Sequence, residues 1–445
     1  MKIKEILSYF DVASDDEKEI YAVSDNSKTK KIDWIYFNLS SEEHAKEYIK
    51  EAKLNNAYLV ISQHKINGVI YCKDLKQKIN KFLIDFYKFK KRFKLIGITG
   101  TNGKSSLSNF LKQSLLLCNF KVKNMVCLKE ENSYISNNTT PDSFKLFDIF
   151  KKANRQTLDY LIIEASSIGI KEGRLNNIEF DYLFLTNINS DHLDYHKNIN
   201  DYIQTKTNFI NNSKAIKFIG NNIDSKIELP YIRVNSEIVF KNNKYQLIIK
   251  NKLIKHNLFF KTNLINLSFC YYFLKEIKQK NIDSILCNIK NYKGRLDVVS
   301  TNPLIIIDYA HTATSFENVI EESKILFDKE ILLVFGAGGE RDISKRKEYA
   351  EIANKYHAYS IVTTDNPRNE NSIKIIEDIT RYLQRYEVIE SRKEAIKRGI
   401  NLLDKDKMLL ILGKGNENFI IMNDYKIYHN DYFEVEKCLQ KLILD

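Results

Sequence analysis

Glycine and proline are scarce in this chain, so the few that remain are informative. The 445 residues include 14 glycines and 4 prolines. Glycine tends to persist where a positive φ or a close backbone approach leaves no alternative. Most of the glycines fall inside the short motifs considered below, which indicates that these motifs form tight turns or ligand-binding loops. They are Gly97, Gly100, Gly103, Gly169, Gly294, Gly336, Gly338, Gly339, Gly413 and Gly415.

Paired cysteines and long apolar runs are also lacking. The six cysteines show no CxxC spacing, which argues against a zinc site or a disulfide framework and favours reduced thiols. No segment approaches the roughly 18 continuous apolar residues of a membrane-spanning helix. The beginning of the chain, MKIKEILSYFDVASDDEKE, has no long apolar core and soon turns acidic, unlike a signal peptide. We therefore expect a soluble, cytoplasmic protein without membrane insertion.

The chain has no strong concentration of charge of one sign. Its 69 basic and 57 acidic residues give a net charge of +12, but the two signs are interspersed. A basic P-loop protein that binds nucleic acid, one alternative for this chain, would need a clustered basic face with interleaved aromatic residues. Because the charges are dispersed, we expect no nucleic-acid partner. We expect the substrates to be small molecules and the protein to be a monomer.

Strand-like and helical stretches alternate along the whole chain, which predicts an α/β fold with mainly parallel sheets. The length is sufficient for several domains. The pattern restarts after the basic run at 90–92 and again near 304, and it predicts three domains. These are a small N-terminal α/β module (1–92), a central domain with a mainly parallel sheet and the P-loop described next (93–293), and a C-terminal Rossmann-like domain (294–445).

A phosphate-binding loop is predicted at residues 99–106, which read TGTNGKSS. An apolar strand precedes the loop, and apolar residues at helical spacing follow it. Ile98 stands where the usual GxxxxGK[ST] pattern has glycine, so this loop is a shorter variant; the alternative is a chance glycine turn. Backbone N–H groups and a lysine would hold nucleotide phosphates, and a serine hydroxyl would reach Mg²⁺. The residues concerned are Gly100, Thr101, Asn102, Gly103, Lys104, Ser105 and Ser106.

Two polar clusters follow the next predicted strands of the central domain. Glu164 closes one strand, and His192 lies shortly after another. Mg²⁺ between nucleotide phosphates needs only one or two carboxylates from the protein, so Glu164 is a candidate ligand with His192 close by. Either residue alone could equally be a polar cap at the end of a strand.

The order and spacing of these motifs resemble the Mur ligase family, and within it the type that adds diaminopimelate. The similarity is strong over 95–420 and weak before residue 90. The motifs that carry it, besides the phosphate loop, are Asn138-Thr-Thr-Pro141, Glu164-Ala-Ser-Ser167, NxxxDHLDYH ending at His196, Gly294-Arg-Leu-Asp297, Asp308-Tyr-Ala-His311, Gly338-Gly-Glu-Arg-Asp342, Asp365-Asn-Pro-Arg368 and Gly413-Lys-Gly-Asn-Glu417.

The resemblance implies an enzyme of peptidoglycan precursor synthesis that uses ATP and Mg²⁺. A carboxylate of UDP-N-acetylmuramoyl-L-alanyl-D-glutamate would be phosphorylated by ATP, and the amine of meso-diaminopimelate would capture the acyl phosphate. Phosphoryl transfer depends largely on positioning and charge neutralisation, which suits these residues. Alternatives are a ligase of the same type that uses L-lysine or another amino acid, and a ligase similar to folylpolyglutamate synthase.

The resemblance also assigns roles to individual residues. Lys104, Glu164, His192 and Lys206 would be catalytic. Lys206 would be carbamylated, and its carbamate would bind a second Mg²⁺, in addition to the metal ligands Ser105, Glu164 and His192. By local sequence alone, Lys206 is a solvated helix residue. The family also implies ATP contacts by Asn263 and Asn266 near the adenine, by Arg295 at the phosphates and by Asp308 at the ribose, with His311 close by. A helix N-cap is equally plausible for Asn263, and a structural ion pair is the alternative for Arg295 and Asp308.

Two further sets of residues would hold the other substrates. The muramoyl dipeptide is assigned to Asn26, Asn138, Thr139, Thr140, Ser166 and Arg174. The first 90 residues lack the arginine of the family's uridine-binding segment. Diaminopimelate is assigned to Arg341, Asp365, Asn366, Pro367, Arg368, Gly413 and Glu417. The guanidinium of Arg368 would form a bidentate pair with the distal carboxylate, and Glu417 would accept the ammonium. Without the family, Asn-Pro-Arg is an ordinary turn with an exposed arginine.

Overall fold

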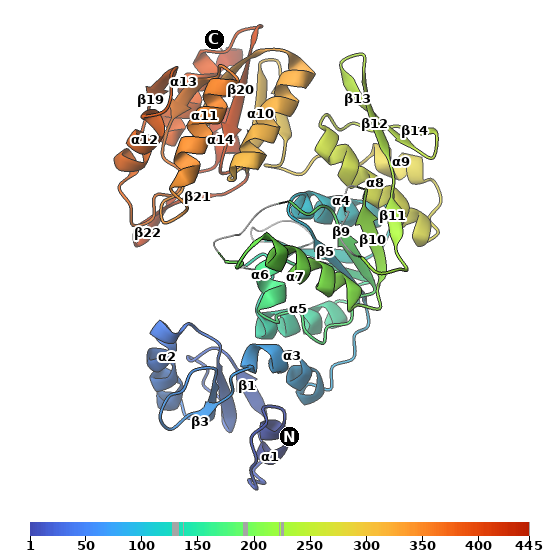
Figure 1. Ribbon diagram of the computed structural model, residues 1–445, viewed down its shortest axis with the longest axis vertical. Helices are drawn as coiled ribbons and strands as arrows, with labels where there is room; N and C mark the ends of the chain where they lie inside the picture. The colour runs from blue at the N-terminus through green and yellow to red at the C-terminus, as the bar shows by residue number, and fades with distance from the viewer. Residues whose placement is uncertain (127–132, 137, 190–194, 222, 224–226, 445) are drawn as a thin grey trace. The chain divides into compact units, whose positions relative to one another are not determined.

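The computed structural model describes residues 1–126, 133–136, 138–189, 195–221, 223 and 227–444 (Figure 1). The chain forms two compact units. The first consists of residues 1–235 and 272–279, and the second of residues 236–271 and 280–445. Within the described ranges, none of the helices combines the length and hydropathy that a membrane crossing requires.

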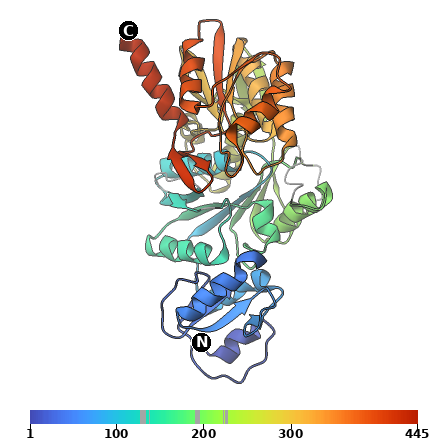
Figure 2. The same cartoon turned by 90° about the vertical axis from the view of Figure 1, so that its left-hand side faces the viewer.

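The first unit begins with a small module, blue in Figures 1 and 2, built on a four-stranded parallel sheet. Strand β2 is buried at every position because it is an almost continuous apolar run. In space the order follows the sequence: β1 (Ala22–Ser24), β2 (Trp34–Asn38), β3 (Ala57–Ser62) and β4 (Ile70–Tyr71). The helices are α1 (Ile3–Ser8), α2 (Glu42–Leu54) and α3 (Leu75–Phe86).

A seven-stranded parallel sheet forms the centre of the first unit. Its order in space is β11-β10-β9-β5-β8-β6-β7. The strands are β5 (Lys94–Thr99), β6 (Val122–Val126), β7 (Ser133–Ile135), β8 (Tyr160–Glu164), β9 (Tyr182–Leu185), β10 (Ile216–Gly220) and β11 (Ile232–Val234). The helices are α4 (Lys104–Leu117), α5 (Ser143–Arg155), α6 (Ser167–Lys171) and α7 (Ile199–Asn211).

One apolar core joins the small module to the central sheet. Helix α3 buries Leu75, Ile79, Phe82 and Leu83, a spacing that places all four on one face. The Phe37 ring of β2 lies 5.3 Å from the Phe82 ring and 5.7 Å from a phenylalanine ring of α5. Aromatic pairs at these separations add to the stability that burial alone provides. The module is therefore packed onto the central sheet through α5.

The second unit contains a six-stranded sheet in the order β15-β16-β20-β17-β18-β19. Every pair is parallel except β15 with β16. The strands are β15 (Asp297–Thr301), β16 (Leu304–Asp308), β17 (Glu330–Phe335), β18 (Tyr359–Val362), β19 (Tyr386–Val388) and β20 (Lys407–Leu412). The helices are α10 (Ala313–Phe327), α11 (Ser344–Lys355), α12 (Ser372–Thr380), α13 (Arg392–Asn401) and α14 (Asp431–Leu444). Helix α11 contacts α10 and α12, whereas α13 contacts α14.

Two smaller antiparallel sheets and two helices complete the described part of the chain. The first sheet contains β12 (Glu237–Lys241), β13 (Lys244–Ile249) and β14 (Lys252–Ile254). The second is the hairpin of β21 (Phe419–Met422) and β22 (Tyr425–Tyr428). The helices α8 (Lys261–Glu276) and α9 (Ile282–Cys287) precede β15.

The predicted α/β fold with mainly parallel sheets is confirmed. The apolar run before the phosphate loop, the run that ends at Glu164 and the run that restarts near 304 form β5, β8 and β16. Because β9, β5 and β8 are neighbours and parallel, their carboxyl ends meet at one edge of the central sheet. This edge is where ligands bind in open α/β sheets, and the phosphate loop follows β5 there.

Candidate active site

The phosphate loop turns sharply between β5 and α4 with the help of two glycines. Gly103 has a φ of 83° and Gly100 a φ of 142°, values in the region that favours glycine. A Cβ on Gly100 would also collide with the Thr186 hydroxyl. Lys104 Nζ donates to the carbonyls of Gly100 (3.0 Å) and Thr101 (2.8 Å). The loop therefore gathers backbone N–H groups and a cation at the start of a helix, as phosphate binding requires.

Residues from the neighbouring strand and helix fix the loop in place. The Asn102 backbone N–H donates to Asn187 Oδ1 (2.9 Å), and Asn187 Nδ2 donates back to the Asn102 carbonyl (3.1 Å). The hydroxyls of Thr101 and Tyr202 lie 2.8 Å apart and are buried. Neither Asn187 nor Tyr202 was among the predicted site residues. Asn187 opens the NxxxDHLDYH motif, so its position after a strand was a usable signal.

Ser105, in the first turn of α4, lies beside Glu164, the last residue of β8. Ser105 Oγ donates to Glu164 Oε2 at 3.1 Å, and Glu164 is only 6% exposed. A hydroxyl and a carboxylate next to a phosphate loop are the oxygen ligands that Mg²⁺ prefers, so these residues fit the metal. Ser106 is buried in the first turn of α4. His192, the other predicted metal ligand of this edge, lies outside the described residues.

Lys206 of α7 is buried beside the phosphate loop and is not the solvated helix residue that local sequence suggests. Its side chain is 1% exposed. Nζ donates to the Gly100 carbonyl at 3.0 Å and lies 3.4 Å from Thr99 Oγ1. Burial of a lysine is unusual because the charged amine loses its water. The position of Lys206 therefore suits a function at the loop.

Three of the residues assigned to the muramoyl dipeptide form one cluster next to Glu164. Thr140 Oγ1 donates to the Glu164 carbonyl (2.8 Å), and Ser166 Oγ lies 3.0 Å from the same hydroxyl. Arg174 Nη1 donates to the Thr140 carbonyl at 2.6 Å and pairs with Glu172. The cluster places hydroxyls and a guanidinium beside the predicted metal ligands.

The other three dipeptide residues are less closely involved in this cluster. Asn138 and Thr139 are exposed, and the Asn138 carbonyl accepts from Ser136 Oγ. Asn26 is exposed in the N-terminal module, where its Oδ1 accepts from the Lys28 N–H of the same turn. The structure therefore does not bring Asn26 to the cluster, and its contact with the uridine stays a prediction.

In the second unit, Asn263 and Asn266 lie within α8. The helix begins at Lys261, so Asn263 is not its N-cap and that alternative is wrong. Both side chains are buried. Asn263 Nδ2 donates to Asn291 Oδ1 at 2.8 Å, whereas Asn266 Nδ2 has no hydrogen-bond partner among the described residues.

Arg295, Asp308 and His311 lie around Tyr309. Arg295 precedes β15, Asp308 is the last residue of β16, and His311 follows β16. The Arg295 guanidinium lies 4.4 Å from the centre of the Tyr309 ring, and the His311 ring lies 4.8 Å from it. The Asp308 carboxylate accepts the N–H groups of Leu296 and Ala310, both at 2.6 Å. Burial raises the pKa of Asp308 to about 6, although Arg295 and the two N–H groups oppose this shift.

The Asp365-Asn-Pro-Arg368 segment is not an ordinary exposed turn, because hydrogen bonds hold Arg368 in place in spite of an unfavourable backbone conformation. Arg368 has a φ of 53°, its N–H donates to the Ile421 carbonyl (3.0 Å) and its carbonyl accepts from the Asn423 N–H (2.7 Å). Arg368 Nη1 donates to the Gly339 carbonyl at 2.6 Å. A Cβ built on Gly338 would lie 3.1 Å from Arg368 Nη1 and 3.7 Å from Arg341 Cγ. Two guanidinium side chains therefore flank Gly338.

The Gly413–Glu417 loop meets this segment. Asn366 Nδ2 donates to Glu417 Oε2 at 3.1 Å. Gly413 has a φ of 108°, and a Cβ there would lie 2.5 Å from Asp365 Oδ2, so glycine is required. Pro367 lies against Gly339, whose Cβ would collide with the Pro367 carbonyl. The residues assigned to diaminopimelate thus come from two loops that meet, with the Arg368 guanidinium on the Gly339 carbonyl and the Glu417 carboxylate on the Asn366 amide.

Comparisons with known proteins show which family the chain belongs to. The Mur ligase middle domain matches residues 98–286, and the domain described as "Mur ligase, glutamate ligase domain" matches residues 294–415. A Rickettsia conorii protein named UDP-N-acetylmuramoyl-L-alanyl-D-glutamate–2,6-diaminopimelate ligase is 31% identical over 95% of this chain and 97% of its own length. The chain belongs to the Mur ligase family.

Two solved structures share the fold of this chain over most of its length. A structure of a UDP-N-acetylmuramoyl-L-alanyl-D-glutamate–2,6-diaminopimelate ligase covers 100% of both chains with a TM-score of 0.64 and 21% identity. The MurF ligase of Thermotoga maritima in complex with ADP covers 88% of this chain and 93% of its own, with a TM-score of 0.60 and 15% identity. The predicted family membership and Mur ligase fold are confirmed.

Lys414 is a residue of this Mur ligase that the sequence reasoning missed, although it lies inside the Gly413–Glu417 motif. Its side chain is fully buried, and Nζ contacts Asn366 Oδ1 (3.0 Å), Glu417 Oε2 (2.9 Å) and Asp365 Oδ1 (3.7 Å). A buried ammonium among two carboxylates and an amide holds their oxygens in fixed positions. Lysine is usually exposed, so its type alone gave no signal.

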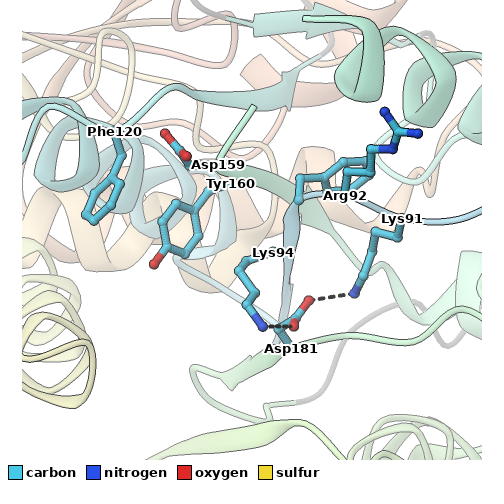
Figure 3. A pocket seen from close by; sticks show the side chains of 8 residues that line it. Lys91, Arg92, Lys94, Phe120, Asp159, Tyr160 and Asp181 are labelled. Carbon is cyan, nitrogen blue, oxygen red and sulfur yellow. Dashed lines mark hydrogen bonds and ion pairs between the residues drawn. The ribbon is translucent and has the colours of Figure 1, made fainter. Parts of the chain in front are cut away.

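A surface pocket of about 520 Å³ lies at the opposite edge of the central sheet of this Mur ligase, where β5, β8 and β9 begin (Figure 3). Lys91 and Lys94 point to Asp181 from two sides, at 2.5 and 2.9 Å. Burial alone would raise the pKa of Asp181, but hydrogen bonds from Lys91, Lys94 and the Leu95 N–H lower it. The charges of these residues are engaged in fixing the start of β5, far from the phosphate loop at its end.

Proposed function

We propose that this Mur ligase family member is an ATP-dependent, MurE-type ligase that joins meso-diaminopimelate to UDP-N-acetylmuramoyl-L-alanyl-D-glutamate. The D-glutamyl carboxylate attacks the γ-phosphate of ATP, which gives an acyl phosphate and ADP. The amine of diaminopimelate then attacks the acyl carbon, phosphate leaves and an amide forms. The product is a precursor of peptidoglycan, and we place the reaction in the cytoplasm with a monomeric enzyme.

The observation that carries the proposed substrate is the pairing of two separate motifs in the second unit. Asn366 of the Asp365–Arg368 segment bonds Glu417 of the Gly413–Glu417 loop, while Arg368 is anchored on Gly339. The distal carbon of diaminopimelate carries a carboxylate and an ammonium. Arg368, with Arg341 beside it, would hold the carboxylate, because a guanidinium binds carboxylate in two hydrogen bonds. Glu417 would hold the ammonium.

The first unit supplies the groups for phosphoryl transfer. Lys104 and the N–H groups of the loop bind and orient the phosphates, because phosphoryl transfer depends mainly on positioning and on neutralised charge. Ser105 and Glu164 would hold Mg²⁺, with His192 as a further ligand. When bound, Mg²⁺ would neutralise phosphate charge during the transfer. Lys206, as its carbamate, would hold a second Mg²⁺. Thr140, Ser166 and Arg174 would orient the muramoyl dipeptide beside these groups.

The proposed function is tested by product mass. The purified protein is incubated with ATP, Mg²⁺, UDP-N-acetylmuramoyl-L-alanyl-D-glutamate and one amino acid at a time. We expect the mass of the diaminopimelate adduct, and little product with L-lysine. Arg368→Lys keeps the charge but loses the bidentate geometry, so it should raise the KM for diaminopimelate and leave the KM for ATP near its original value. Equal turnover of L-lysine would disprove the specificity, and turnover of folates would indicate the folylpolyglutamate class.

A further inference from the structure

Asn291, between α9 and β15, links the predicted adenine-binding helix to the beginning of the C-terminal sheet. Its Nδ2 donates to the carbonyls of Leu296 (2.6 Å) and Arg295 (3.1 Å). Its Oδ1 accepts from Asn263 Nδ2 at 2.8 Å. Asn291 is not part of the motifs that gave the predicted site residues.

These contacts fix the orientation of two side-chain amides in succession. A carbonyl oxygen can only accept a hydrogen bond, so the two carbonyls require Asn291 to present its NH₂ group to them. Asn291 must then present Oδ1 to Asn263. Because Oδ1 can only accept, Asn263 must in turn point its NH₂ group at Asn291. The Asn263 oxygen is thereby directed away from Asn291.

The nearby Asn266 adds a donor to this acceptor. Asn263 and Asn266 are three residues apart in α8 and so lie on the same side of the helix. Asn266 is 2% exposed, and its Nδ2 has no hydrogen-bond partner among the described residues. A buried donor without a partner is costly in free energy, which points to an acceptor on a ligand.

We propose that Asn291 is a positioning residue that makes the nucleotide site of this ligase selective for adenine. Adenine offers an NH₂ donor at N6 beside an acceptor at N7, whereas guanine and hypoxanthine offer an acceptor at both places. The fixed Asn263 oxygen accepts from N6, and Asn266 donates to N7. An oxygen at position 6 of the base would face the Asn263 oxygen, acceptor against acceptor. The inference rests on the proposed use of ATP and adds the means of its selection.

The test is direct binding of ATP and ITP by calorimetry, with no other substrate present. ITP has an oxygen in place of the N6 amino group of ATP and a proton on N1, and it keeps N7, so the Asn291 variants report the part of the preference that depends on the Asn263 oxygen. We expect the unaltered protein to prefer ATP by at least about tenfold, since an unpaired buried acceptor weakens binding by about that factor. In Asn291→Ala the Asn263 amide is free to turn, and the preference should fall to about threefold or less. Asn291→Ser keeps a small hydroxyl near the two carbonyls, and its preference for ATP over ITP should fall in the same way.

Asn288→Ala is the matched control, because the Asn288 amide also donates to a backbone carbonyl, that of Ser284 at 2.8 Å, and lies three residues from Asn291. It should keep the full preference. If both Asn291 variants bind ATP and still prefer it as strongly as the unaltered protein, the inference is wrong. If the unaltered protein binds neither nucleotide, the proposed function fails instead. A folded Asn291→Ser protein is sufficient for the decision if the alanine variant does not fold.

Discussion

Lys206 Nζ lies 3.0 Å from the backbone carbonyl oxygen of Gly100, although 105 residues separate them in the sequence. The contact joins α7 to the phosphate loop and takes the lysine out of water. The amine lies against the first glycine of the loop that would bind the phosphates. The proposed carbamate on this nitrogen would turn a cation into an anion at the same place.

Lys206→Ala should lose most of the ligase activity, because the variant removes the proposed metal-binding carbamate. A short carboxylate such as acetate can occupy the space left by the side chain, so adding it should restore part of the rate. The measurement is the rate of ADP release with all three substrates, with and without acetate. Lys217→Ala is the control, since Lys217 is also buried in this domain but lies on β10. Acetate should not raise its rate, and unimpaired turnover in Lys206→Ala would refute the assignment.

Stability of the second unit should depend on the buried pair of Arg392 and Asp431. Both side chains are fully buried, and Arg392 Nε and Nη2 each donate to Asp431 at 2.8 Å. Removing one partner leaves a buried charge unpaired, so Arg392→Ala should lower the free energy of unfolding by about 3–5 kcal/mol. Arg398→Ala, on the same helix but in an exposed pair with Glu387, should cost less than about 1 kcal/mol. Urea unfolding followed by circular dichroism compares them, and equal midpoints would contradict the prediction.

The same pair predicts a loss of stability in acid. Burial alone would raise the pKa of Asp431, but the charge and hydrogen bonds of Arg392 and the hydrogen bond of His429 outweigh it and lower the pKa. A carboxyl with a lowered pKa stabilises the fold fully above its unfolded pKa of about 4. That contribution to the free energy of unfolding decreases as the pH falls below about 4. Thermal unfolding between pH 7 and pH 3 should show the decrease, and it should be smaller in Arg392→Ala.

The sequence predicted the strands and the loops of the candidate sites well, because both depend on local patterns. The apolar run at 94–99, the glycines of the loop and the Ser105–Glu164 pair all follow from strand, turn and parallel-sheet rules. By contrast, the burial of Lys206 and Lys414 depends on partners distant in sequence or on loop folding, and lysine is usually exposed. The role of Asn291 requires two backbone carbonyls whose direction no pattern of residue types encodes. Local sequence therefore indicated which segments form the candidate sites, and long-range contacts determined which side chains are buried there.

ATP binding should weaken in acid because of Asp308. Its pKa is raised to about 6 by burial, so at pH 5 only about a tenth of the carboxyl is ionised and able to accept from ribose hydroxyls. The apparent Kd for ATP should therefore be about tenfold higher at pH 5 than at pH 7.5. Asp308→Asn should show a flatter profile, since it has no carboxyl to titrate. Calorimetric titrations at several pH values make the comparison, and equal slopes in the two proteins would exclude Asp308 as the group responsible.

The same carboxyl predicts a change in stability of the opposite sign to that of Asp431. A carboxyl whose folded pKa lies above its unfolded pKa of about 4 binds its proton more tightly in the folded state. Its contribution to the free energy of unfolding is therefore largest below pH 4 and is lost as pH rises through about 6. In Asp308→Asn, the loss of stability between about pH 4 and pH 6 that comes from this carboxyl should be absent. Unfolding midpoints of the two proteins at pH 4.5 and pH 7 measure it, and an unchanged pH dependence would contradict the assignment.

Lys414→Met should weaken the use of diaminopimelate more than that of ATP. Methionine keeps the length of the side chain, but the carboxylates of Asp365 and Glu417 lose the buried cation between them, and Asn366 loses a donor. Because these groups would no longer be held in place, the KM for diaminopimelate should rise at least tenfold, roughly the effect of one lost charged hydrogen bond. The KM for ATP should change less than about twofold.

Lys426→Met is the control for that variant, since Lys426 is exposed on β22 of the neighbouring hairpin. It should leave both KM values near those of the unaltered protein. The split between the two KM values separates positioning from general unfolding, because a partly unfolded enzyme loses rate with every substrate while its remaining folded fraction keeps the same KM. A folded Lys414→Met protein with an unaltered KM for diaminopimelate would show that Glu417 and Asn366 keep their places without the buried cation.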